Sequence, residues 1–327
     1  MKKTILNFIV LIILLIAMII FSAITGSIKI TPYELIQGLI NKENYNVDVI
    51  KDLRFPRLII ALLAGAALAV SGVLFQSVLR NPLAEPGIIG VSSGASFMTI
   101  LMVSLFPTLY FYGPLFAFLG GAIAFILVYS FSWKSGLDPL RMILIGVAIN
   151  AVFTSLSQTF NYRGSYTSSV VQEVTTSTLG MRKWADVDII LIYGSIGLIL
   201  AYLVYSWCNY LVLEDKTARN LGMNVNIARF IVSIIAVLLA SIATATAGMF
   251  AFVGLLIPHI ARRIIGTNHK FLIPYSALLG ALFILSADTI GRLIIAPNEI
   301  PASIIVALFG GPFLIFILRK GDRVYGR

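Results

Sequence analysis

Charged residues are scarce in this chain. Only 12% of its 327 residues are Asp, Glu, Lys or Arg, and 59% are hydrophobic, whereas soluble domains are roughly a quarter charged and half apolar. This balance excludes a soluble globular domain and predicts a polytopic membrane protein. The net charge of +10 does not indicate nucleic acid as a partner, because basic residues collect in the inner loops of membrane proteins.

Cysteine, histidine and nucleotide-binding motifs are also scarce. The single cysteine, Cys208, excludes an internal disulfide framework. His259 and His269 have no cysteines or acids clustered around them, so we expect both to be structural and no metal site to form. The sequence contains no Walker A motif, so the chain is not expected to bind ATP through a P-loop. No catalytic constellation indicates an enzyme.

Long apolar runs are present instead. A membrane-spanning helix needs about 20 mainly apolar residues, and the first run, after "MKK", is longer than the roughly 7–15 residues of a signal peptide core. We expect it to be retained as a span, with a cleaved signal as the alternative. The sequence predicts one all-α transmembrane domain over residues 1–327, with about ten helices near 5–27, 57–79, 93–111, 114–133, 141–160, 187–211, 229–247, 250–265, 272–290 and 300–318. The eighth is short for a span, which indicates a tilted or broken helix.

The distribution of basic residues predicts the orientation. Ten spans place both termini on one side of the membrane. With the N-terminus inside, 15 of the 24 Lys and Arg residues lie in inner segments and 9 in outer ones, and most acids of the loops lie outside. The positive-inside rule therefore predicts that both termini face the cytoplasm.

The segment "RNPLAEPG" at residues 80–87 interrupts the chain between spans two and three. Pro82 and Pro86 disfavour helix at the residues before them, Asn81 and Glu85. Irregular backbone near membrane depth is tolerated only where protein or water covers it. We expect this segment to line a cavity, and a plain tight turn is the alternative.

Two spans carry side-chain patterns that predict their surroundings. Ala61, Gly65 and Ala69 form a small-residue face on span two, which suits close helix packing and predicts a central position. One face of span five is polar, which predicts a water-filled translocation path or, alternatively, hydrogen bonding between helices. Its residues are Asn150, Thr154, Ser157, Gln158 and Asn161.

Two further features concern charge. Asp288 lies in span nine, where an ionisable residue is a functional candidate, although pairing with Arg292 one turn later explains it equally well. The segment 214–229, "EDKTARNLGMNVNIAR", is too polar to span the membrane. It is either a short helix that docks a cytoplasmic partner or a solvated loop.

Three blocks of the sequence resemble FecCD-type permeases, the membrane subunits of ABC importers for iron-siderophores, haem and cobalamin. They are "RFPRLIIALLAGAALAVSGVLFQSVLRNPLAEPGIIGVSSGAS", "GMFAFVGLLIPHIARRIIG" and "LLGALFILSADTIGRLIIAPNEIPASIIVALFGGPFLIFIL". The resemblance implies ten spans in the cell membrane, a second permease subunit that is identical or paralogous, two cytoplasmic ATPases that carry the ATP and magnesium, and an external binding protein. No cofactor is expected on this chain itself.

The resemblance also implies roles for individual residues. Asn81 and Leu83 correspond to the cytoplasmic gate, and Pro139 and Leu140 in "GLDPLRM" correspond to its second part, where the family can carry small polar residues. In "EDKTARNLG", the run that contacts the ATPase matches at Ala218, Leu221 and Gly222, whereas Glu214 stands where the family commonly has glycine.

Three arginines are expected at the outer face, namely Arg54, Arg57 and Arg292. The resemblance implies that they bind acidic residues of the external binding protein, and anchoring to lipid headgroups is the alternative. The expected cargo is a ferric siderophore, with haem or cobalamin as alternatives. An ion-coupled secondary transporter is the alternative from another class, but it needs acids along the path, and only Asp288 is available.

Overall fold

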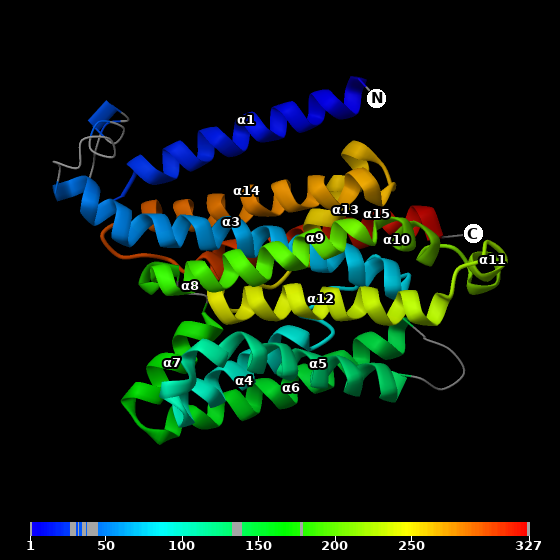
Figure 1. Ribbon diagram of the computed structural model, residues 1–327, viewed down its shortest axis with the longest axis horizontal. Helices are drawn as coiled ribbons and strands as arrows, with labels where there is room; N and C mark the ends of the chain where they lie inside the picture. Colours follow the sequence, from blue (N-terminus) through cyan, green and yellow to red (C-terminus); the bar gives the residue numbers. More distant parts are fainter. Residues whose placement is uncertain are drawn as a thin grey trace.

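The computed structural model describes residues 2–26, 31, 33, 34, 37, 45–132, 139–176 and 179–325. Within these residues it is built from helices and contains no strand, and the long helices run roughly side by side (Figure 1). A bilayer offers no hydrogen-bond partners to the backbone, so a helix that satisfies its own amides and carbonyls is the expected element. The all-α class is confirmed.

The helices form two groups on either side of α12 (Val225–Ala247) (Figure 1). One group surrounds the long helix α3 (Tyr45–Leu79), which contacts α12 as well as several helices of its own group. That group comprises α1 (Lys2–Ile24), α13 (Val253–Ile265), α14 (His269–Ile294) and α15 (Ala302–Tyr325). The other group comprises α4 (Val91–Leu105), α5 (Gly113–Ser132), α6 (Pro139–Thr159) and α7 (Ser165–Thr175), with 3-10 turns at Pro107–Tyr112 and Phe160–Arg163. A further 3-10 turn, Leu179–Met181, contacts α3.

One expected span is an interrupted helix that ends beside the coupling segment, residues 214–229. It consists of α8 (Trp184–Ile189), a π-helical turn (Ile190–Gly194), α9 (Ser195–Leu203) and α10 (Tyr205–Leu211). The short helix α11 (Asp215–Asn220) follows, at the end of the molecule where α1 begins and α15 ends (Figure 1). We call this the coupling end and the opposite one the distal end. The location of both termini at the same end agrees with an even number of membrane crossings. That this end faces the cytoplasm stays a prediction.

Seven described helices are long and apolar enough to cross a bilayer, and Val91–Leu105 and Ala302–Phe316 are shorter apolar helices. The expected span at 250–265 is short for a crossing, as predicted. Its helix, α13, begins only at Val253 and has 13 residues, about 20 Å at 1.5 Å per residue, against a hydrocarbon core of about 30 Å. By length α13 is a half-span, and the ten-span count stays an expectation.

Helix α3 begins earlier than the sequence predicts. The expected start was residue 57, after Pro56, but the helix continues through this proline from Tyr45. Val47 and Ile50 are buried, so the added turns gain apolar contact that offsets the amide bond that proline cannot make.

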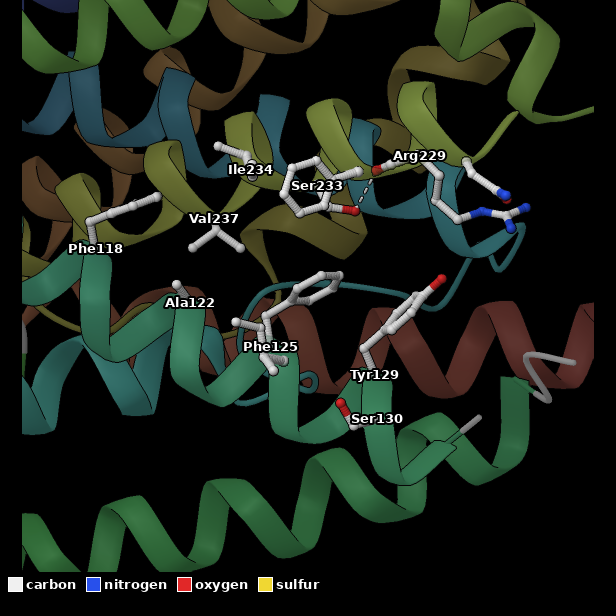
Figure 2. A pocket seen from close by; sticks show the side chains of 12 residues that line it. Phe118, Ala122, Phe125, Tyr129, Ser130, Arg229, Ser233, Ile234 and Val237 are labelled. Atoms are coloured by element: carbon white, nitrogen blue, oxygen red, sulfur yellow. Dashed lines mark hydrogen bonds between the residues drawn. The ribbon is translucent and has the colours of Figure 1, made fainter. Parts of the chain in front are cut away.

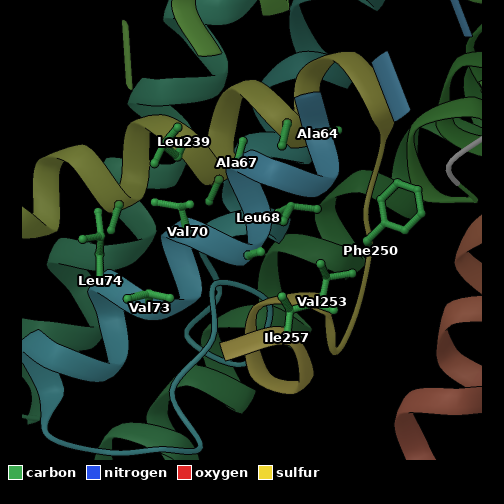
Figure 3. Close-up of a cluster of buried hydrophobic side chains, with 14 of the residues drawn as sticks. Ala64, Ala67, Leu68, Val70, Val73, Leu74, Leu239, Phe250, Val253 and Ile257 are labelled. Atoms are coloured by element: carbon green, nitrogen blue, oxygen red, sulfur yellow. The ribbon is translucent and has the colours of Figure 1, made fainter. Parts of the chain in front are cut away.

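The small-residue face of α3 is central, as predicted. Ala61 and Ala69 are fully buried, and a Cβ placed on Gly65 would lie 2.2 Å from the carbonyl oxygen of Gly280 in α14. The two helices therefore touch through their backbones. The apolar side chains of α3 also pack in one buried cluster with those of α12 and α13, among them Leu74, Leu239 and Ile257 (Figure 3).

Candidate functional site

The gate loop, defined as residues 80–90, begins with a tight turn. Arg80 leaves α3 with a φ of 48°. The Asn81 side-chain oxygen accepts the Leu83 amide at 2.9 Å, and the Ala84 amide donates to the Asn81 carbonyl at 3.1 Å. Asparagine side chains commonly hold turns in this way. The two expected gate residues, Asn81 and Leu83, therefore lie together, the first buried and the second half-buried.

The rest of the loop returns into the molecule. A Cβ placed on Gly254, at the start of α13, would lie 2.9 Å from Pro86 Cδ and 3.3 Å from Gly72 Cα. Gly72 precedes Leu79, the end of α3, by seven residues, which is about 10 Å along the helix axis. The loop is thus re-entrant and covered by protein, as irregular backbone at this depth must be.

Glu85 joins the gate loop to α13. Its side chain is buried, at 3% exposure, and Oε1 accepts the amide of Phe252 at 3.2 Å. Phe252 is the residue before α13, and the Leu255 amide also hydrogen-bonds the carboxyl group. The first amides of a helix lack intrahelical acceptors and carry the positive end of its dipole. Glu85 therefore caps the broken helix from within the loop.

The loop also rests on α6, through two glycines. A Cβ on Gly146 would lie 2.4 Å from the carbonyl oxygen of Ile88. Gly90 has a φ of +84°, and a Cβ there would lie 3.5 Å from the backbone nitrogen of Asn150. The loop is thereby in contact with the first residue of the polar stripe. Pro139 and Leu140 open α6, but their side chains lie outside the described part of the chain.

The polar stripe of α6 is divided by the fold. Asn150, Thr154 and Asn161 are half-buried and Gln158 is exposed, and the Asn161 side-chain Nδ2 donates to the Gln158 side-chain oxygen. Ser157 is buried, and its hydroxyl donates to the Phe153 carbonyl of its own helix at 2.9 Å. Ser157 thus lies on the packed side of α6. A translocation path along the other four stays a prediction.

A charge cluster links the gate loop to the coupling segment. Asp215, the first residue of α11, accepts hydrogen bonds from Arg80 and, at 3.0 Å, from Arg229 of α12. Arg80 also donates to the Leu211 carbonyl at 2.7 Å. Burial raises the pKa of Asp215, but the two arginines outweigh it, and its pKa lies below the usual 3.8. Asp215 therefore joins the first residue of the gate loop to α11 through an ion pair.

The coupling segment exposes two of the three residues that the resemblance indicated and buries the third, Ala218. Glu214 is the N-cap of α11, and its carbonyl accepts the Ala218 amide at 2.9 Å, so a helix forms without glycine there. Ala218 is fully buried, whereas Leu221 is 60% exposed. Gly222 has a φ of +84° and no atom within 4 Å of a built Cβ. Leu221 and Gly222 therefore face outward, and contact with an ATPase stays a prediction.

The three arginines lie at the distal end and have partners within the chain. Arg57 is 9% exposed and binds Asp288 through two nitrogens at 2.8–3.0 Å and Glu299 at 2.7 Å. Arg292 lies 3.4 Å from Asp288, confirming their i,i+4 pairing, and donates to Ser22 of α1. Arg54 donates to the Ala23 carbonyl at 3.0 Å. Docking of a binding protein stays a prediction, and these internal contacts compete with it.

The histidines are placed by packing. His269 is buried between Asn209 and Ser77, with ring nitrogen contacts of 2.8 and 2.7 Å, and is structural, as expected. His259 lies edge-on to the Phe313 ring. Within the described ranges, no group of three or more His, Cys, Asp or Glu side chains is arranged to hold a metal.

Four functional candidates were missed from the sequence: Glu85, Arg80, Asp215 and Arg229. Glu85 had a local signal, since it is an acid between two prolines in a segment that is otherwise apolar. Asp215 and Arg229 lie in the segment 214–229 that the sequence singled out, but no local signal pairs them with Arg80, which is 135 residues from Asp215. Only the tertiary structure brings them together.

The comparisons with known proteins agree with one another. The FecCD transport family matches residues 14–320. Curated relatives from Staphylococcus aureus, named "Probable heme-iron transport system permease protein IsdF", are 41% identical in strain MSSA476 and 40% in strain Newman, over 98% of both chains.

Solved structures give the same fold. One, described as an inward-facing conformation of the metal-chelate ABC transporter type, superposes with a TM-score of 0.79 at 28% identity, over 97% of this chain and 99% of the other. PsaBC from Streptococcus pneumoniae in complex with Fab gives a TM-score of 0.61 at 17% identity, over 88% of this chain and 95% of the other. This second likeness concerns the fold alone.

Proposed function

The chain belongs to the FecCD transport family, and on this basis we propose that it is the permease subunit through which an ABC importer moves haem iron into the cytoplasm. It is a multi-pass membrane protein of the ABC importer permease type. The observation that carries the cargo assignment is the 41% identity, over 98% of both chains, with permeases named for heme-iron transport. Ferric siderophores, the cargo expected from the sequence, become the second candidate, which the likeness to a metal-chelate type transporter also fits.

The proposed assembly has a second permease, identical or paralogous, two ATPases at the coupling end and a binding protein at the distal end. The outward-facing Leu221 and Gly222 support an ATPase contact. ATP hydrolysis would then move α11, and Asp215 would transmit the movement to Arg80 and the gate loop. The chain itself supplies the gate and performs no chemistry on the cargo.

The ion-coupled alternative finds no support in the structure. Its candidate acid, Asp288, is 1% exposed and contacts both Arg57 and Arg292. A carboxylate held between two guanidinium groups is neutralised where it lies and is poorly suited to carry a proton across the membrane.

Transport in reconstituted liposomes tests the proposal. The permease, its ATPase and its binding protein would be supplied with haem or with a panel of ferric siderophores, and uptake would be measured with and without ATP. We expect ATP-dependent haem uptake that stops when the Walker A lysine of the ATPase is replaced by alanine. Uptake of siderophores but not haem would support the second cargo. Uptake driven by a proton gradient without the ATPase would overturn the importer assignment.

A further inference from the structure

A groove of about 560 Å³ runs between α5 and α12 (Figure 2). Its walls are mainly apolar and aromatic, and Phe118, Phe125, Tyr129, Phe230, Ile234 and Val237 lie along them. The volume is in the range of ligand pockets, about 300–1,000 Å³. Phe230 is 66% and Ile126 60% exposed, so the groove opens sideways, toward the space that a bilayer fills.

One end of the groove is polar. Arg229 lies there, close to the start of α12, with Asn226 and Ser130 nearby. The arginine is 8% exposed, and one of its terminal nitrogens binds Asp215. Tyr129 also interacts with the guanidinium. Within the described part of the chain, the Arg229 Nε, which is buried, has no acceptor.

The charge around this end is incompletely balanced. Asp215 is shared by Arg80 and Arg229, so the cluster of three side chains carries a net charge of +1. A buried donor without an acceptor is uncommon and calls for a partner. An anionic group in the groove beside Arg229 would offset the excess charge and offer an oxygen acceptor to the guanidinium group.

We propose that the groove binds an anionic phospholipid, with an acyl chain along the walls of α5 and α12 and the phosphate at Arg229. The inference goes beyond the proposed transport function and rests on it only in assigning the coupling end to the cytoplasmic leaflet. Basic pockets between transmembrane helices on that side are suited to anionic headgroups. A zwitterionic lipid carries its own cation next to the phosphate and would gain nothing from the net positive cluster.

The retention of lipids by the purified permease tests this site. The protein would be equilibrated in mixed micelles with equal amounts of phosphatidylglycerol and phosphatidylcholine, and bound lipid would be counted by native mass spectrometry. We expect a preference for phosphatidylglycerol of about five-fold, the factor that one arginine gives near an anionic lipid. Arg229→Gln should remove this preference.

Two pairs of variants separate the site from general effects. Arg263→Gln makes the same charge change at an exposed position of α13 outside the groove and should keep the preference. Ala122→Trp fills the groove without touching Arg229 and should reduce bound phosphatidylglycerol, whereas its neighbour Ile123→Trp, which does not line the groove, should not. Equal retention of the two lipids by the parent protein, or an unchanged preference in both Arg229→Gln and Ala122→Trp, would overturn the proposal, whether or not haem is the cargo.

Discussion

Arg57 connects three segments at the distal end of the molecule: α3, which carries it, α14 through Asp288, and the chain before α15 through Glu299. Arginine suits this position because its planar fork can satisfy two carboxylates at fixed angles. These contacts use most of the hydrogen-bond donors of the Arg57 side chain. We therefore expect the first effect of replacing Arg57 to be on the stability of the permease and not on the binding of an external partner.

We predict that Arg57→Met destabilises the permease by about 3 kcal/mol, the lower end of the cost of breaking a buried ion pair, because Asp288 keeps only its 3.4 Å contact with Arg292. Thermal unfolding in detergent would measure this, with Lys51→Met, an exposed change on the same helix, as the control. Adding Asp288→Asn should restore part of the loss. If Arg57→Met instead unfolds like the parent but loses affinity for the binding protein, the docking role expected from the sequence is correct.

Glu85 allows a sharper test of the gate. We predict that Glu85→Ala leaves the Phe252 amide, at the start of α13, without its acceptor, at a cost of about 1–3 kcal/mol, and makes liposomes leaky or ATP hydrolysis poorly coupled to transport. Glu85→Gln keeps an acceptor oxygen in nearly the same place and should retain coupling. Leakage and coupling equal to the parent in the alanine variant would show that the cap is not part of the gate.

Among the elements, hydropathy predicted most helices because a bilayer imposes length and apolarity on each one. The backbone contact of α3 was also predictable, since Gly65 and its small neighbours mark a face. The non-helical break before α13 was less predictable, because the residue that caps this helix, Glu85, lies in a loop more than 160 residues earlier in the chain. Likewise the acids that bind Arg57 lie 231 and 242 residues away, beyond any local pattern.

At Gly65, where α3 touches the backbone of α14, we expect that no side chain can be accommodated. Gly65→Ala would place a Cβ 2.2 Å from a backbone oxygen, so we predict a destabilisation of about 3 kcal/mol, at the upper end of the usual cost of overpacking. Gly311→Ala in α15, where nothing lies within 4 Å of a built Cβ, should be neutral or slightly stabilising. Equal melting temperatures for the two variants would show that the helices can separate at little cost.

For the whole molecule, the two ends differ in the charge of their loops, and this asymmetry predicts the orientation. We predict that a cysteine replacing Tyr162, which is 92% exposed at the distal end, reacts with an impermeant maleimide on intact cells. A cysteine replacing Thr217 in α11 should react only after permeabilisation. Native Cys208 is fully buried and should not react with the maleimide either before or after permeabilisation. The reverse labelling pattern would show that the protein has the opposite orientation in the membrane and that the coupling segment does not face the ATPase.

The half-length of α13 has a consequence for amide hydrogen exchange. Residues 248–252 join α12 to α13 as non-helical chain, with left-handed backbone at Phe252 and the Met249 amide bonded to the Val174 carbonyl. Amides outside regular helix open at lower free energy than those in a packed helical core. Deuterium should therefore enter this stretch sooner than the buried turns of α12 beside it, in a band of fast exchange deep within a slowly exchanging protein. Glu85→Ala should widen that band into the first turn of α13.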